Sequence, residues 1–469
     1  MEAALLIDIG STFTKACAIN LDDEQLLASV STPSTTRTDI CEAIDNAILL
    51  MHEAVGEKLD FKIRLASSSA AGGLRIIVVG LVPDLTSQAA RLAALGAGAK
   101  VISTYSYKLS DIEQKEINKQ NPDIMLLVGG TDGGDEETIL WNAKILSGLE
   151  FDAPIIVAGN KVVSREAERI IKNSGKDAYI SENVLPQIGE LNVEPVRKII
   201  RTIFIDRIII SKGFEKVNKY IDGVLMPTPT AVFEAVELLS KGTESIEGMG
   251  ELVAVDIGGA TTDVYSMATG RPTKEGTILK GFPPPYSMRT VEGDLGLRSN
   301  AISIVEEVGE QRVLENIGIK NIDLRKITEM LSHNTAKIPR KTIDRAIDVG
   351  LAISAAQVAL ERHSGHLETI STPMGMMNVQ HGKDLTRIGC LIATGGIFAH
   401  HAKKSSIRIF KGALSNREPF SLRPQKPQFY VDTNYIMYGI GLLSKYYPEK
   451  AIKVLKKNLS RIDQYERMD

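Results

Sequence analysis

The first candidate for chemistry in this sequence is an aspartate at the end of an apolar run, followed by a glycine, three hydroxyl residues and a lysine. Residues 7–15 read IDIGSTFTK. Backbone N–H groups in a tight glycine-containing turn form a concave anion site, the lysine adds a point charge, and Asp8 could order a hydrated magnesium ion. Taken alone, the motif is explained equally well by phosphate binding and by an ordinary polar hairpin turn. Its candidate residues are Asp8, Gly10, Ser11, Thr12, Thr14 and Lys15.

A second segment repeats these features in the other half of the chain, where residues 255–267 read VDIGGATTDVYSM. Two matched loops that face each other would hold a polyphosphate from both sides, and Asp256 could orient the attacking water or hold the magnesium shell. One glycine-rich loop is a weak signal, but a matched pair is much stronger. The candidates are Asp256, Gly258, Gly259, Thr261 and Thr262; alternation alone does not assign Asp263 to core or solvent.

A third motif, IATGGIFAHH at residues 392–401, places Thr394, Gly395 and Gly396 between an expected strand and an expected helix. Two adjacent glycines allow a flat ring or a phosphate to pack directly on the backbone. In isolation, a helix start that requires a positive φ is the better explanation.

In this order, the three motifs resemble the nucleotide-binding signature of the actin, heat-shock chaperone and sugar kinase superfamily. The superfamily's first loop reads D-x-G-S-x-x-x-K, its second phosphate motif is similar to residues 255–267, and its adenosine motif is similar to ATGG. A glycine-bearing segment near the C-terminus resembles its second connecting segment. The matching residues are Asp8, Gly10, Ser11, Lys15, Gly439 and Gly441.

This resemblance implies two halves of shared topology that close over Mg-ATP. ATP and Mg²⁺ would be the cofactors, and the catalytic residues would be Asp8, Lys15 and Asp256. Asp8 and Asp256 would hold the metal through water, and the glycines and hydroxyl residues of the three motifs would bind the nucleotide.

Within that superfamily, residues 68–83, 95–102, 289–298 and 377–387 resemble the family of the glutamate mutase accessory protein, component L, and the likeness runs over nearly the whole chain. The resemblance implies an ATP-dependent reactivating chaperone for an adenosylcobalamin-dependent mutase, either glutamate mutase or a related aminomutase. It would promote release of damaged cobalamin. The connection to cobalamin comes from the resemblance alone.

Fold does not fix function, so other activities remain open. The main alternative is a small-molecule kinase that transfers the ATP γ-phosphate; a filament-forming actin relative is another. An ATP-driven electron donor would need an iron–sulfur cluster, and three scattered cysteines, Cys17, Cys41 and Cys390, are too few for one within a single chain. A homo-oligomer stays possible.

Composition excludes several classes of partner. The 469 residues include 55 basic and 58 acidic side chains, so net charge gives no reason to expect nucleic acid or an anionic membrane. The most apolar stretch, residues 74–83, is about half the length of a membrane span. Without a signal peptide pattern and with few cysteines, the chain is expected to be cytoplasmic.

The apolar pattern indicates which elements position the motifs. Residues 3–9 with 15–21, and residues 252–268, read as two strand–turn–strand hairpins. From about 86 to 200, apolar strands alternate with helices, which indicates a parallel sheet covered on both faces. We therefore expect an α/β protein: an actin-like, ribonuclease H-like ATPase duplication with an inserted doubly wound parallel α/β domain. The expected domains are residues 1–85, 86–220 and 221–469.

Four other polar features have plain explanations. His363 and His366 fit a solvated helix end, and residues 403–426, with seven basic and one acidic side chain, fit a solvated loop. Glu292 and Asp294 could supply a kinase base but fit a capped turn at least as well. The acidic segment 129–137 fits a helix N-terminus.

Overall fold

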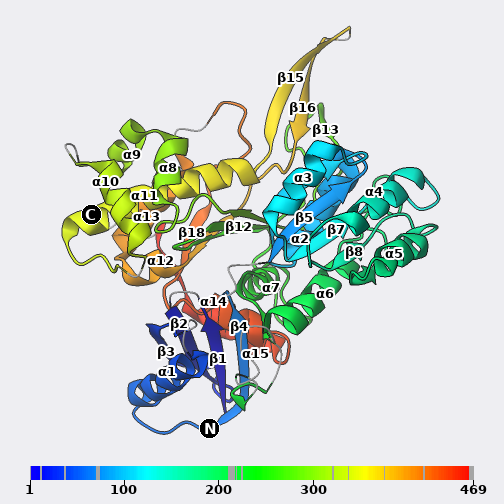
Figure 1. Cartoon of the computed structure of the whole chain (residues 1–469). Helices are drawn as coiled ribbons and strands as arrows, with labels where there is room; N and C mark the ends of the chain where they lie inside the picture. The colour runs from blue at the N-terminus through cyan, green and yellow to red at the C-terminus, as the bar shows by residue number, and fades with distance from the viewer. Residues whose placement is uncertain are drawn as a thin grey trace. The chain divides into compact units, whose positions relative to one another are not determined.

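The computed structural model describes residues 2–10, 13–35, 39–69, 74–209, 217, 219–222, 225–319, 322–335, 337–373, 375–415 and 418–463. Contacts between residues divide the chain into two compact units (Figure 1). The first unit comprises Met1–Ser67, Lys219–Val224 and Ala231–Asp469, and the second comprises Ser68–Asn218 and Leu225–Thr230.

The first sheet of the first unit contains the predicted N-terminal hairpin. Its strands are β1 (Ala3–Ile9), β2 (Phe13–Asn20), β3 (Gln25–Pro33) and β4 (Phe61–Ser68), in the order β4-β1-β2-β3. Every residue of β1 is buried, which explains its unbroken apolar run. Helix α1 (Ile40–Val55) packs on β3 and β2.

The second sheet of the first unit repeats this arrangement. Its order is β14-β12-β11-β17-β18-β19, with β14-β12-β11 antiparallel and β11-β17-β18 parallel. The strands are β11 (Leu252–Ile257), β12 (Thr262–Met267), β14 (Ser287–Glu292), β17 (Cys390–Thr394), β18 (Gln428–Asp432) and β19 (Leu459–Arg461). Since β3-β2-β1-β4 corresponds to β14-β12-β11-β17, the predicted actin-like, ribonuclease H-like duplication is confirmed.

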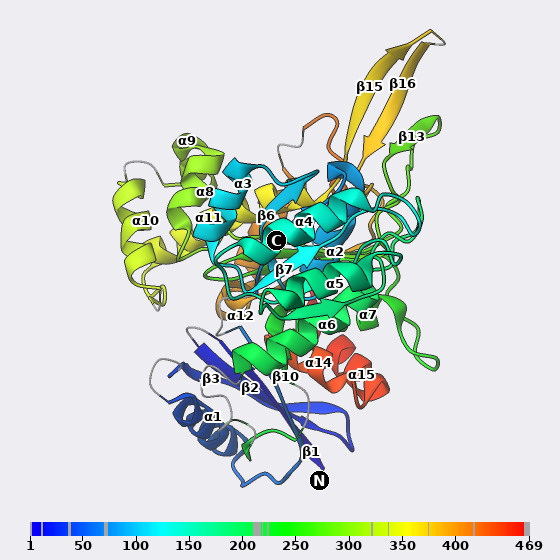
Figure 2. The same cartoon turned by 45° about the vertical axis from the view of Figure 1, so that its right-hand side comes forward.

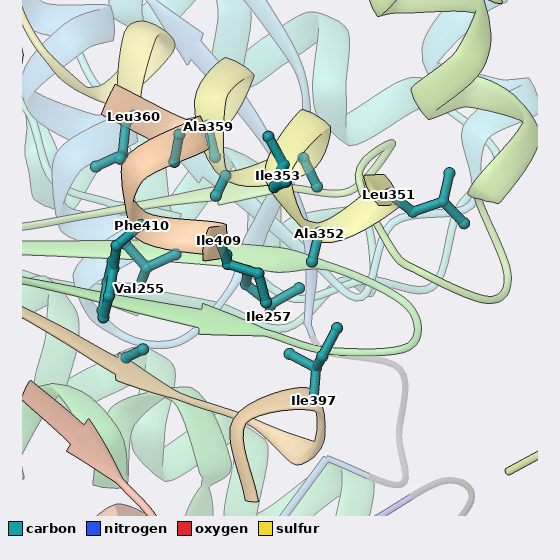
Figure 3. Packing of buried hydrophobic residues seen from close by; sticks show 14 of the residues in the cluster. Val255, Ile257, Leu351, Ala352, Ile353, Ala359, Leu360, Ile397, Ile409 and Phe410 are labelled. Carbon is teal, nitrogen blue, oxygen red and sulfur yellow. The ribbon is translucent and has the colours of Figure 1, made fainter. Parts of the chain in front are cut away.

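Helices pack on this second sheet and form its hydrophobic core. Figure 3 shows Val255 and Ile257 of β11 packed near side chains of α11 and of α13. The helices that follow β14 and β17 are α8 (Ala301–Val308), α9 (Glu310–Ile317), α10 (Leu324–His333), α11 (Thr342–His363), α12 (Gly396–His400) and α13 (Lys403–Leu414). The remaining helices of the C-terminal part are α14 (Met437–Leu443) and α15 (Pro448–Asn458), and α7 (Thr228–Lys241) precedes β11.

The basic segment 403–426 is not the solvated loop that its composition suggests. Its first half is α13, whose residues Ile409 and Phe410 are buried. Arg423 is also buried, and its Nε lies 2.7 Å from Glu361 Oε2. The expectation was wrong because the carboxylate that neutralises Arg423 lies far away in sequence.

A three-stranded sheet extends from the end of α11, formed by β13 (Thr277–Lys280), β15 (His366–Thr372) and β16 (Gly375–His381) (Figure 2). His363, just before it, was expected at a solvated helix end, but its side chain is buried. Its Nδ1 lies 2.8 Å from Thr290 Oγ1 and its Nε2 lies 2.8 Å from Ser266 Oγ. Both ring nitrogens are therefore satisfied within the core.

The second unit contains the predicted doubly wound parallel sheet. All neighbouring strands are parallel, in the order β6-β5-β7-β8-β9, which is a doubly wound arrangement. Its strands are β5 (Arg75–Gly80), β6 (Lys100–Ser106), β7 (Ile124–Leu127), β8 (Ile155–Val157) and β9 (Ala178–Ile180), and the short β10 (Leu225–Pro227) belongs to its second segment. Its helices are α2 (Gln88–Gly96), α3 (Asp111–Gln120), α4 (Glu137–Gly148), α5 (Ser164–Asn173) and α6 (Glu194–Ile203), with π-helical turns η1 (Pro83–Ser87) and η2 (Phe204–Ile209). Among the described residues of both units, no helix is long and apolar enough to cross a bilayer.

Candidate functional site

The two aspartate-led turns of the first unit have the same construction. Asp8 lies opposite Lys15 in the β1–β2 register, and Asp256 lies opposite Asp263 in the β11–β12 register. In the first turn the N–H of Gly10 donates to the carbonyl of Phe13 at 3.2 Å, and in the second the N–H of Gly258 donates to the carbonyl of Thr261 at 2.9 Å. The internal repeat seen in the sequence is therefore a repeat of backbone structure, with each aspartate at the end of its strand.

Lys15 is held by groups from two distant parts of the first unit. Its Nζ donates to Asp8 Oδ2 at 3.1 Å and lies 4.0 Å from the centre of the Tyr435 ring. Burial alone would lower the pKa of Lys15, but Tyr435 and the Asp8 carboxylate raise it overall. The ammonium is therefore charged and fixed in place beside the strand-end aspartate.

Asp256 is a carboxylate without enough neutralising charge around it. Burial, the neighbouring Asp263 and the more distant Asp8 raise its pKa to about 7, against the opposing effect of Lys15. Its Oδ1 is buried and has no hydrogen-bond partner among the described residues. A buried orphan carboxylate oxygen of this kind fits a cation or a water that carries one.

The third motif comes directly against Asp256. Gly395 has a φ of 112°, and a Cβ there would lie 2.9 Å from Asp256 Oδ1. Only glycine fits this approach. Asp8, Lys15, Asp256 and Gly395 thus lie close together in the first unit, although the sequence separates them widely.

Thr394 makes a contact that sequence reasoning missed. Its Oγ1 donates to Asp432 Oδ2 at 3.0 Å, and Asp432 also accepts the N–H groups of Ile436 and Met437 at 3.1 and 3.0 Å. Asp432 therefore links the third motif to the start of α14, and its burial raises its pKa. The available signal was the segment VDTNY, which begins at the end of β18 and precedes the helix that carries Gly439 and Gly441.

Three threonines of the two turns, Thr14, Thr261 and Thr262, bond to protein groups. Thr14 Oγ1 lies 2.8 Å from the hydroxyl of Ser34, and Ser34 donates to the carbonyl of Gly10 at 2.6 Å. Thr261 donates to Asp263 at 2.9 Å, and Thr262 donates to the carbonyl of Leu295 at 2.7 Å. These hydroxyls fix the shapes of the turns, which leaves backbone groups as the main candidates for phosphate contacts.

The remaining predicted ligand residues are placed as follows. Gly259 adjoins the Arg298 side chain, where a Cβ would meet Cγ at 3.6 Å, and Gly396 begins α12. Ser11 and Thr12 lie outside the described residues.

Three sets of ion pairs lie in the same part of the first unit, and none of them was identified from the sequence. Asp263 accepts from Arg289 Nε at 2.9 Å, and both side chains are buried. Arg298, beside Gly259, makes two bonds to Asp348, at 2.9 and 2.7 Å. A third set joins the two acids considered as a kinase base: Arg362 lies 2.8 Å from Glu292 and 2.9 Å from Asp294.

Two carboxylates of the first unit are of the kind through which a hydrated metal ion binds. Among the described residues, no group of three or more His, Cys, Asp or Glu side chains could hold a metal ion. Mg²⁺ commonly binds through one or two carboxylates together with waters and substrate phosphates, which Asp8 and Asp256 can provide. Asp8 and Asp256 are therefore the residues that could hold such an ion.

Two sequence comparisons match almost the full length of the chain. A sequence profile of the family described as "MutL protein" matches residues 4–459. A Clostridium tetanomorphum protein named "Protein MutL" is 42% identical over 463 residues, which are 98% of this chain and 100% of that protein. Among solved structures, diol dehydratase-reactivating factor in nucleotide-free form is 12% identical with a TM-score of 0.36, covering 95% of this chain and 100% of that one. Gluconate kinase from Lactobacillus acidophilus is 11% identical with a TM-score of 0.32, covering 97% and 90%.

Proposed function

Since the chain belongs to the protein family described as MutL protein, we propose that it is an ATP-dependent reactivating chaperone for an adenosylcobalamin-dependent mutase of the glutamate mutase type. The observation that supports ATP hydrolysis is a pair of matched aspartate-led turns whose aspartates both interact electrostatically with Lys15, together with the buried orphan Oδ1 of Asp256. The mutase as client rests on the sequence likeness to component L of glutamate mutase.

Lys15, Asp8 and Asp256 would have different roles in phosphoryl transfer to water. Lys15, fixed by Asp8 and Tyr435, presents a permanent positive charge to the phosphates. Asp256 would orient the attacking water and accept its proton. Asp8 and Asp256 would hold Mg²⁺ through water, and the ion would neutralise charge on the phosphates.

Hydrolysis would drive reactivation through differential affinity. ATP and ADP can shift the chaperone between two conformations only if they bind those conformations with different affinity. One nucleotide state would then bind the inactivated mutase and favour loss of its damaged cobalamin, and the other would release it. The chemical products are ADP and free phosphate.

The decisive experiment compares Asp8→Ala and Asp256→Ala with Asp60→Ala, an exposed aspartate of the same unit. We expect both site variants to lose ATP hydrolysis and rescue of a cobalamin-inactivated mutase together, while the control retains both. Rescue that survives without hydrolysis would refute the coupling.

Product analysis separates this function from that of a small-molecule kinase. A kinase would form ADP together with a phosphorylated metabolite, whereas the proposed chaperone forms ADP and free phosphate. The pairing of Glu292 and Asp294 with Arg362 weighs against these two acids as a substrate base.

A further inference from the structure

An aromatic residue in the second unit has an unfavourable backbone conformation, although its side chain is not part of the hydrophobic core. Tyr107, directly after β6, has a φ of 68°, and its side chain is 60% exposed. The left-handed region is unfavourable for a bulky residue and easy for glycine. Folding gains little from an exposed ring held in this way, and backbone strain of this kind gathers at functional sites.

A buried amide fixes the loop that carries Tyr107. Asn142 of α4 is fully buried; its Nδ2 donates to the carbonyl of Tyr107 at 2.9 Å, and its Oδ1 accepts the N–H of Leu109 at 2.9 Å. The N–H of Tyr107 also donates to the carbonyl of Leu81 at 3.1 Å. Three hydrogen bonds therefore determine the position of an exposed loop.

The same helix presents a second exposed aromatic side chain beside this loop. Trp141, adjacent to Asn142 and the single tryptophan of the chain, is 45% exposed. The Nζ of Lys108 lies 5.4 Å from the centre of its ring and also pairs with Glu137. Tyr107, Lys108 and Trp141 form what we call the aromatic patch, carried by α4 and the loop between β6 and α3, all of which Figure 2 shows.

The elements that carry the aromatic patch also carry acidic groups. Exposed acids begin both helices: Asp111 is the first residue of α3, and Glu136 and Glu137 lie at the start of α4. Lys108 and Glu137 neutralise each other, which leaves the carboxylates of Asp111 and Glu136. These carboxylates oppose nucleic acid phosphates and anionic lipid, whereas they complement a basic protein surface.

We propose that the aromatic patch docks the mutase client, on a surface that offers an apolar pocket rimmed by lysine or arginine. Tyrosine and tryptophan are the residues that most often dominate the affinity of protein interfaces, and rigid aromatic groups lose little conformational entropy on binding. That the bound protein is the mutase rests on the proposed function. That its binding surface is apolar and rimmed by basic residues rests on the composition of the aromatic patch.

Because the chain has one tryptophan, incorporation of 5-fluorotryptophan gives a protein with a single ¹⁹F NMR resonance, that of Trp141. We expect this resonance to shift or broaden when unlabelled mutase is added, and to do so less as salt is increased. A shift that depends on the chain's own concentration without mutase would instead indicate that the patch pairs two copies, and would overturn the proposal.

Two variants test the patch by affinity, measured calorimetrically with the mutase. Trp141→Ala and Tyr107→Gly should each weaken binding at least tenfold, while Ile188→Ala, at another exposed apolar residue of the second unit, should leave it unchanged. Tyr107→Gly also relieves the left-handed strain, so its thermal midpoint should stay equal or rise. A purely structural role for Tyr107 predicts a lower midpoint instead.

The outcomes separate this inference from the proposed function. If the mutase binds and is reactivated by ATP, but the resonance does not move and the variants bind normally, the docking site is wrong and the function stands. If the mutase does not bind in any nucleotide state, both are wrong.

Discussion

The surroundings of Asp256 in the folded chain disfavour ionisation of its carboxyl group. Burial and the carboxylate of Asp263 raise its pKa to about 7, from a usual value of 3.8. Between these two values the folded chain binds a proton at this site that the unfolded chain has lost. The stability of the fold therefore falls as the pH rises from about 4 to about 7.

Replacing Asp256 with asparagine should remove this pH dependence. We expect Asp256→Asn to be more stable than the natural chain at pH 8 by roughly 1–3 kcal/mol, and to differ little from it near pH 4. Denaturant unfolding without nucleotide at the two pH values measures the difference. Asp60→Asn provides the control, and an equal effect at both pH values would contradict the explanation.

Lys383 is a buried amine with only neutral acceptors bonded to it. Its Nζ donates to the carbonyl of Tyr286 at 2.7 Å and to Ser266 Oγ at 3.1 Å, and burial lowers its pKa to about 7. The unfolded chain keeps this proton up to a pH of about 10.5. Stability should therefore rise with pH between about 7 and 10.

Lys383→Met should flatten that rise. For one group the slope is at most about 1.4 kcal/mol per pH unit. Urea unfolding of the natural chain and the variant at pH 7 and pH 9 tests it, with the exposed Lys58→Met as control. A steep rise that persists in Lys383→Met would assign the effect to other groups.

At the scale of elements, α14 lies so close to neighbouring elements that two of its positions, 439 and 441, have no room for a Cβ atom. A Cβ at Gly439 would lie 2.8 Å from Cys17 Sγ of β2, and one at Gly441 would collide with the backbone of Ala231 in α7. The same helix begins just after Asp432, which bonds to Thr394. The two glycines therefore let α14 connect both sheets of the first unit.

Gly441→Ala should destabilise the chain by about 1–3 kcal/mol through overpacking and should also reduce ATP turnover. Gly148→Ala is the matched control: Gly148 ends α4 with no atom within 4 Å of its Cβ position, so alanine there should stabilise by a few tenths to about 1 kcal/mol. Thermal unfolding and phosphate release measure the two effects. Equal destabilisation by both substitutions would contradict the packing argument.

The period of the apolar residues predicted those helices and strands that pack against elements close to them in sequence. Both hairpins and the alternating strands and helices of the second unit were predicted because each apolar pattern has a local period. The sheet of β13, β15 and β16 was missed, since its strands carry mixed polar and apolar residues and gain their partners only in the fold. Arg423 was misjudged for the same reason: Glu361 is distant in sequence.

The candidate site was predictable in part. Strand-end aspartates and glycine turns are local signals, so Asp8, Asp256 and Gly395 could be selected from the sequence; their catalytic and binding roles remain predictions. Tyr435 and Asp432 were not selected, because the segment VDTNY indicates only a passage from strand to helix, and their importance comes from contacts with Lys15 and Thr394. The hydroxyls of Thr14 and Thr262 are bonded within the protein, which no spacing reveals.

At the scale of the whole molecule, the thermal unfolding of the two units can be followed by different spectroscopic signals. The single tryptophan lies in the second unit, whereas the candidate nucleotide site lies in the first. A ligand stabilises the unit that binds it by mass action, about 2.7 kcal/mol at a concentration of 100 times Kd.

A non-hydrolysable ATP analogue with Mg²⁺ should therefore raise the thermal transition seen by far-ultraviolet circular dichroism more than the transition seen by tryptophan fluorescence. The analogue without metal should have a smaller effect. Equal shifts of both signals would show that the two units unfold together, and no shift would contradict nucleotide binding.

The insertion of one unit within the other affects the order in which the chain can fold as it is synthesised. The second unit joins neighbouring strands through adjacent helices, so its core can form once residues up to about 230 have been made. By contrast, β1 and β2 pack against α14, more than 400 residues later. The contacts of the N-terminal hairpin with α14 therefore form only at the end of translation, and the first unit, with its candidate site, is expected to be the last part to mature.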